Sequence, residues 1–160
     1  MDGYERADGA RGNALVLIWA ATPEDSAMLE QWAVDRIPYM RGGSFGPCIC
    51  GGVVRDGALR AVVVFSEWQP EYRTLQSSIA SDGPGWATRG VLREMFRYAF
   101  VTAGANLLWS SMRADNEEAI EFNRRLGFRR DAVLRHRYGR GKHAVITSMT
   151  RGAWLRSQWR

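Results

Sequence analysis

The chain has 160 residues and a mass of 18.0 kDa, which is about the size of one domain and enough to bury a core without disulfides or metals. Hydrophobic residues make up 46% and charged residues 24%, a balance that argues against intrinsic disorder. The longest apolar runs, 14–21 and 61–65, are too short to cross a membrane. The first twelve residues carry no apolar signal segment, so we expect a cytoplasmic protein with no membrane attachment.

Positive charge is concentrated in the last third of the chain. Residues 1–112 carry 10 Arg and no Lys against 12 acidic residues, a net charge of −2, whereas residues 113–160 carry 11 Arg and Lys142 against 5 acidic residues, a net charge of +7. A basic segment of this kind could bind an anionic partner, either nucleic acid or a phosphorylated cofactor. A solvated surface in an arginine-biased chain explains it equally well.

We expect residues 13–154 to fold as one domain, after a flexible lead at 1–12 and before a basic tail at 155–160. The domain opens with the run Asn13–Ala20, whose Val, Ile and Trp residues predict a buried strand. The pair Thr22-Pro23, followed by two acidic residues, is typical of a helix start, with Thr as the cap and Pro in the first turn. A helix is therefore predicted from this point to the residues before Pro38.

A hairpin and a third strand are predicted next. The apolar runs Cys48–Val54 and Leu59–Trp68 are separated by the turn Arg55-Asp56-Gly57. Asp-Gly between two apolar runs is a strong sign of a β-hairpin. Polar and apolar residues then alternate over Tyr72–Ser81, which predicts a further strand.

The second half alternates helices and strands. Apolar residues at helical spacing predict a helix over Trp86–Val101, and Gly127 is a good stop for a helix over Asn116–Leu126. Strands are predicted at Leu107–Met112, Phe128–Tyr138 and His143–Thr150, the last two joined by a turn at 139–141. This order of elements predicts an α/β fold around a mixed sheet.

The segment Gly83-Pro84-Gly85 lies between a predicted strand and a predicted helix. Glycines at such a point allow a tight turn, and the exposed amide groups together with the helix N-terminus favour an anion such as a pyrophosphate. Thr88 and Arg89 could add a hydroxyl and a cation. The segment matches neither a Walker A loop nor a dinucleotide fingerprint. A loop that only turns the chain is the alternative.

Two motifs together resemble the GCN5-related N-acetyltransferase (GNAT) family. One is the stretch Gly83-Pro84-Gly85-Trp86-Ala87-Thr88-Arg89, and the other is Asn116 to Phe128, with the pattern Asn-x-x-Ala followed by Leu-Gly-Phe. The ending from Arg135 to Tyr138, and on through Met149-Thr150-Arg151, is similar to the closing hairpin of that family. The segment Phe45-Gly46-Pro47 resembles the short members encoded by bacteriophages.

The resemblance implies a single-domain GNAT-like fold, with a mixed central sheet, helices on both faces, and acetyl-CoA between two splayed parallel strands. Those strands would be Tyr72–Ser81 and Leu107–Met112. The resemblance assigns the following residues to coenzyme A: Ile79, Ala80, Gly83, Pro84, Gly85, Trp86, Ala87, Thr88, Arg89, Asn116, Ala119, Phe122 and Asn123. It also places Arg124, Arg125, Arg129 and Arg130 near the adenosine 3′-phosphate.

The implied reaction is direct transfer of an acetyl group to an amine, which needs a neutral amine, a polarised carbonyl and a proton for the thiolate. The sequence departs from the family at three positions. Ala80 stands where the family has an Arg or Gln, Asn123 where it often has a tyrosine acid, and Gln76 lies on a strand that often carries a glutamate base. The remaining candidates for catalysis are Glu67, Ser78, Tyr138 and His143, each of which could instead be an ordinary surface or strand residue.

The acceptor is open to several readings. It could be a small amine, a protein amine or, as in a phage-type enzyme, a modified DNA base, and Trp68 and Trp86 could shape its pocket. A nucleic-acid-binding module that has lost catalysis and a homodimer that keeps only the fold are the alternatives. Cys48 and Cys50, even with the two histidines, match no zinc spacing, so no metal is expected.

Overall fold

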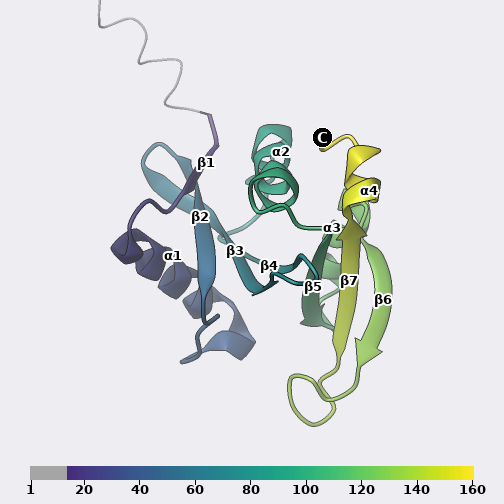
Figure 1. Ribbon diagram of the computed structural model, residues 1–160. Helices are drawn as coiled ribbons and strands as arrows, with labels where there is room; N and C mark the ends of the chain where they lie inside the picture. The colour runs from purple at the N-terminus through teal and green to yellow at the C-terminus, as the bar shows by residue number, and fades with distance from the viewer. Residues whose placement is uncertain (1–13) are drawn as a thin grey trace, which may run out of the picture. The chain divides into compact units, whose positions relative to one another are not determined.

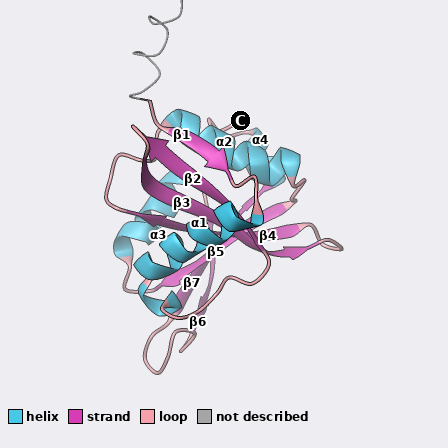
Figure 2. Cartoon of the chain, turned by 90° about the vertical axis from the view of Figure 1, so that its left-hand side faces the viewer, coloured by secondary structure: helices cyan, strands magenta, loops and turns pink. Residues whose placement is uncertain are grey.

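The computed structural model describes residues 14–160, so the predicted lead at 1–12 lies outside the described residues. Seven strands form a mixed sheet in the order β1-β2-β3-β4-β5-β7-β6 (Figure 1). The strands are β1 (Val16–Trp19), β2 (Cys48–Arg55), β3 (Ala58–Gln69), β4 (Thr74–Ser81), β5 (Leu107–Arg113), β6 (Arg129–Leu134) and β7 (Ala144–Thr150). The helices are α1 (Pro23–Arg36), α2 (Arg89–Arg97), α3 (Glu117–Leu126) and α4 (Arg151–Leu155). The predicted α/β class and mixed sheet are confirmed (Figure 2).

The described residues divide into two compact units. The first holds 14–44, 49–64 and 79–95, and the second holds 45–48, 65–78 and 96–160. No helix within residues 14–160 is both long enough and apolar enough to span a membrane.

Helices cover both faces of the strands in the first unit. A Cβ built on Gly52 would lie 3.1 Å from the Leu29 side chain of α1, whereas a Cβ on Gly51 would collide with the ring of Trp19 at 2.8 Å. Successive strand residues point to opposite faces. Since the Trp19 indole N–H donates to Glu94 of α2 over 3.2 Å, α1 and α2 lie on opposite sides of β1 and β2.

Local turn and cap chemistry fixes the ends of several elements. Asp56 and Gly57 both have positive φ, 51° and 73°, as a two-residue type I′ hairpin turn requires, which confirms the predicted turn between β2 and β3. The Thr22 hydroxyl accepts the Asp25 amide over 3.1 Å and caps α1 as expected. Gly127, at φ 102°, ends α3 in the left-handed conformation.

Aromatic residues build the core of the second unit. Phe96 and Phe100 are fully buried, and the Trp159 ring stacks on Phe96 with centroids 6.3 Å apart. The Trp159 indole N–H also donates to the Leu126 carbonyl over 2.8 Å. The segment 155–160, expected to be a basic tail, is therefore attached to the core of this unit through Trp159.

Among the described elements, α2 and β6 differ most from their predicted boundaries. The helix expected over Trp86–Val101 begins only at Arg89, because Thr88 caps it by accepting the Val91 amide, and it ends in a π-helical turn (η2, Tyr98–Thr102). The strand expected over Phe128–Tyr138 stops at Leu134, since His136 takes a positive φ of 61° that is incompatible with an extended strand. The residues that follow form the loop between β6 and β7 (Figure 1). A short 3₁₀ turn, η1 (Pro38–Met40), follows α1.

Candidate functional site

The glycine-rich loop of the first unit is exposed and follows β4 directly. The Asp82 amide donates to the Arg60 carbonyl over 3.1 Å and ends the strand. Gly83 and Gly85 then have φ of 123° and 90°, and a Cβ built on either meets no atom within 4 Å. Backbone conformation, and not crowding, therefore requires glycine at both positions.

The loop leads straight into the N-terminus of α2. Trp86 is 8% exposed and anchors the loop from within, while the Gly83-Pro84-Gly85 segment before it is exposed. Thr88 accepts the Val91 amide over 3.4 Å, so its hydroxyl serves the helix cap. Arg89 is exposed at the first position of α2. An exposed turn of backbone followed by a helix N-terminus fits an anion such as a pyrophosphate.

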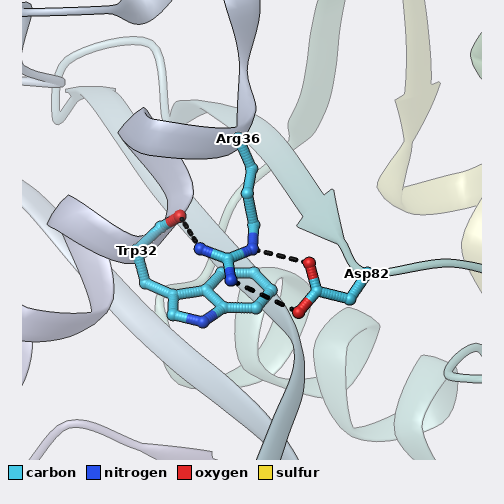
Figure 3. Close-up of polar contacts among 3 residues, drawn as sticks. All are labelled: Trp32, Arg36 and Asp82. Carbon is cyan, nitrogen blue, oxygen red and sulfur yellow. Dashed lines mark hydrogen bonds and ion pairs between the residues drawn. The ribbon is translucent and has the colours of Figure 1, made fainter.

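An acidic residue opens this loop, and α1 holds it. The Asp82 carboxylate accepts two hydrogen bonds from the Arg36 guanidinium, which lies over the ring of Trp32 (Figure 3). The hydrogen bond from Arg36 holds the pKa of Asp82 below its usual value. The sequence pattern did not reveal this contact, because 46 residues separate the two partners.

In the second unit, β4 and β5 pair in parallel, as expected for the two strands of the resemblance. Their register joins Thr74–Gln76 to Leu107–Trp109. One residue further, the Ser77 and Ser110 hydroxyls form a buried hydrogen bond of 2.8 Å. Along its whole length, β5 pairs with β7 on its other side. The parallel pairing thus spans three residues, while β4 itself continues to Ser81.

Both asparagines of the second motif make hydrogen bonds within the protein. The Asn116 side chain accepts the Ala119 amide over 3.2 Å and caps the helix. Asn123, at the position of the family's tyrosine, is 8% exposed and donates to the Thr147 hydroxyl over 3.0 Å. Ala119 and Phe122 are half-buried. The assignment of these residues to coenzyme A remains a prediction.

The opposite face of β5 and β7 carries a second set of hydroxyl groups. The Ser111 and Tyr138 hydroxyls lie 2.6 Å apart, and the Ser148 hydroxyl donates to the Asp131 carboxylate. Asp131 falls where the register between β6 and β7 shifts, and such bulges re-aim a side chain. Of the predicted catalytic residues, Tyr138 is the one that a hydrogen bond to β5 brings to this face.

The other candidates for catalysis lie in different surroundings. Ser78 is half-buried on β4, one residue beyond Ser77. Glu67 is exposed on β3 with a positive φ of 53°, a conformation that costs a non-glycine residue energy. The His143 Nδ1 accepts the His136 amide over 2.9 Å, and the His136 Nδ1 accepts the Gly141 amide. Both imidazoles therefore carry no proton at Nδ1 in this arrangement.

Two of the arginines expected near the 3′-phosphate are already paired. The Arg124 guanidinium binds Glu121 over 2.6 Å and Arg125 binds the same carboxylate over 3.5 Å. Both arginines are largely exposed. Hydrogen bonds from Arg124 hold the pKa of Glu121 below its usual value, so the positive charge on this helix is partly neutralised.

No family model and no curated protein matches the chain. Solved structures do match. A point mutant of spermidine N-acetyltransferase SpeG from Vibrio cholerae aligns with a TM-score of 0.71 at 14% identity, covering 89% of this chain and 96% of that one. The manganese complex of the spermidine/spermine N-acetyltransferase SpeG from Vibrio cholerae aligns with a TM-score of 0.70 at 14% identity, covering 88% and 95%. The dodecameric spermidine N-acetyltransferase from Vibrio cholerae aligns with a TM-score of 0.71 at 15% identity, covering 89% of this chain and 96% of that one. The chain therefore has the GNAT acetyltransferase fold.

Proposed function

We propose that this protein is an N-acetyltransferase that transfers an acetyl group from acetyl-CoA directly to an amine. The observation that carries the proposal is the exposed loop of Gly83 and Gly85 between β4 and the N-terminus of α2, in a fold shared with spermidine N-acetyltransferases. The loop fits a pyrophosphate because both glycines hold positive φ and leave open space where side chains would stand.

The chain's own groups would perform three tasks. Backbone amides from Gly83 to Thr88 would hold the pyrophosphate, and a backbone N–H near Ile79 would polarise the acetyl carbonyl. Bound coenzyme supplies the acetyl group and the thiolate leaving group. We assign the proton donor to Tyr138, because its hydroxyl has a hydrogen-bond partner on β5, namely Ser111, at 2.6 Å.

The acceptor amine is proposed to sit on an anionic molecule. Four exposed cations, Arg135, Arg137, Arg140 and Lys142, lie in the segment between β6 and β7. Such a segment would repel a polycation such as spermidine and attract an anionic molecule that carries the acceptor amine, for example DNA with an aminated base. The proposal therefore departs from the spermidine named for the neighbours.

The decisive experiment is an acetyl-CoA turnover screen that reads the released thiol. The amine panel contains spermidine, amine-bearing nucleotides, aminated DNA and basic peptides. Turnover with an anionic amine, exceeding that with spermidine, is expected. No thiol release above background with any amine, together with no coenzyme A binding by calorimetry, rejects the enzyme.

Substitution at Gly85 tests the loop itself. In both Gly85→Ala and Gly85→Trp the new residue must adopt the strained φ of 90° at this position, so both variants should lose about 1–2 kcal/mol of stability. Only the tryptophan also fills the space above the loop. A folded Gly85→Trp variant should therefore bind coenzyme A at least about tenfold more weakly than Gly85→Ala. Equal affinities would mean that the pyrophosphate binds elsewhere.

A further inference from the structure

Helix α1 is tied to the residue that opens the glycine-rich loop. The Arg36 Nε donates to one oxygen of Asp82 over 2.7 Å and its Nη2 to the other over 3.3 Å (Figure 3). The Nη1 atom donates to the Trp32 carbonyl over 3.2 Å, and the guanidinium carbon lies 3.5 Å from the centre of the Trp32 ring. The guanidinium is thus held at its edges and on one face.

Stability alone gives a weak reason for so many contacts. The side chains of Arg36 and Asp82 are 33% and 49% exposed. Exposed ion pairs contribute little to folding stability. A bidentate, stacked arginine does, however, fix the position and the charge of its carboxylate far better than a single flexible contact would.

The charge of Asp82 is a problem for the loop that follows it. Asp82 directly precedes Gly83, so its Cα lies about 3.8 Å from the first residue of the proposed anion site. A lone carboxylate there would repel the phosphates of coenzyme A. The Asp82 pKa is lowered by the hydrogen bond from Arg36, so the carboxylate is ionised at neutral pH and the pair carries no net charge.

We propose that Arg36 is a positioning residue for the coenzyme, which holds and neutralises Asp82 so that the loop can accept a pyrophosphate. The inference rests on the proposed function, since it takes the loop to be the coenzyme site. It adds a residue from α1, outside both motifs of the resemblance, to the determinants of coenzyme affinity. Arg36 acts through Asp82 and does not itself take part in acetyl transfer.

The test is a double-mutant cycle read by calorimetry with coenzyme A. Arg36→Ala leaves Asp82 with only the weaker attraction of Arg60 and should weaken coenzyme A binding by about tenfold. Asp82→Asn removes the repelling charge and leaves the Arg36 cation, so this variant should bind coenzyme A at least as tightly as the wild type. The double variant should return to within about threefold of the wild type. Arg36→Lys, which keeps the charge without the fork, should bind better than Arg36→Ala.

Two readouts separate this role from a merely structural one. In turnover, Arg36→Ala should raise KM for acetyl-CoA and leave kcat at saturation unchanged. Its affinity deficit should also shrink in about 1 M salt, where the Debye length is about 3 Å. Asp35→Ala is the matched control, because it removes the exposed Gln31–Asp35 hydrogen bond from the same helix and should leave coenzyme binding unchanged.

Several results would overturn the inference. One such result is an Arg36→Ala variant that binds coenzyme A as tightly as the wild type. Another is a double variant that binds as weakly as Arg36→Ala, because the charge of Asp82 would then not be the cause of the weaker binding. If Arg36→Ala fails to fold, Arg36→Met takes its place, since its unbranched stem can still lie over Trp32. The first titration, with the wild type, tests the proposed function separately. If the wild type does not bind coenzyme A, it is the proposed function that is rejected.

Discussion

At the scale of single residues, the contact between Tyr138 and Ser111 is the most informative one for chemistry. The two hydroxyl oxygens are 2.6 Å apart, and Ser111 lies on β5, which is the parallel neighbour of β4. A phenol that protonates a leaving group profits from a partner that orients its hydroxyl. Ser111 supplies that partner, and half-burial of Tyr138 limits the freedom of the ring.

Replacing the phenol tests this assignment. Tyr138→Phe should lower kcat by about a hundredfold while KM for acetyl-CoA changes little, because general-acid catalysis typically contributes a factor of that order. Ser111→Ala keeps the phenol and removes only its partner, so its kcat should fall less. Steady-state kinetics with the best amine from the screen measures both. An unchanged kcat in a folded Tyr138→Phe variant would assign the proton to another group.

Some residue roles were readable from the sequence, while others depend on distant partners. The Thr22 cap and the Gly127 stop act within one turn of helix, so their neighbours in the chain identify them. Asn123 donates to Thr147 on β7, which lies 24 residues away, and no local pattern encodes that bond. The sequence could say only that Asn123 cannot act as the family's tyrosine. The structure adds that its amide is buried and bound.

At the scale of elements, the sequence predicts a turn well where the turn requires particular residue types. Asp56-Gly57 specified a tight hairpin because both positions need positive φ. The extent of β6 was overestimated because apolar and β-branched residues alone do not show where the pairing with β7 ends. The positive φ of His136, and the hydrogen bond from Gly141 to its ring, close the chain into a loop instead.

The carboxyl-terminal segment 155–160 is held in place by the Trp159 side chain. Trp159 stacks on Phe96 and donates to the Leu126 carbonyl, and the Trp154 indole donates to the Trp159 carbonyl. Trp159→Ala should therefore lower the free energy of unfolding by about 2 kcal/mol, below the range for a fully buried tryptophan because the ring is half-buried. Urea titration followed by circular dichroism measures this loss.

Trp159→Phe is the control for that experiment. It keeps a ring to stack on Phe96 but loses the indole donor to Leu126, so about 1 kcal/mol should be lost. A Trp159→Ala variant as stable as the wild type would show that the segment 155–160 contributes nothing to folding, as a free tail would.

At the scale of the whole molecule, the fold tolerates far more sequence change than the activity does. An identity of 14% suffices for the same fold over 89% of the chain, because many apolar sequences satisfy one pattern of strands and helices. Function depends on a site of few residues, and at Ala80 and Asn123 this sequence departs from the pattern of the GNAT family that it resembles. The charge of +7 in the last 48 residues likewise belongs to this sequence, and the proposal of an anionic acceptor rests on it.

The stability of the molecule should depend on pH through three paired carboxylates. Hydrogen bonds from Arg36, Arg113 and Arg124 lower the pKa values of Asp82, Asp115 and Glu121 respectively. The folded state therefore binds fewer protons than the unfolded chain in the acid range. This stability is fully present above the ordinary carboxyl pKa of about 4 and is lost as pH falls through the lower folded values. Because the groups are exposed, the loss should be small and should shrink in salt.

The loss of stability at alkaline pH should have a different cause, which is ionisation of the Tyr98 phenol in the π-helical turn. Burial raises the Tyr98 pKa, and its ring stacks on Phe65 with centroids 5.7 Å apart. The folded state then keeps a proton that the unfolded chain releases, so stability is present below about pH 10 and is lost as pH rises beyond it. Tyr98→Phe retains the stacked ring without the ionisable group and should fall less steeply between pH 9 and 11 (roughly the window set by a free phenol). Urea unfolding at each pH measures the loss of stability in both the acid and the alkaline range. If the wild type and Tyr98→Phe lose stability equally at alkaline pH, other groups cause the loss.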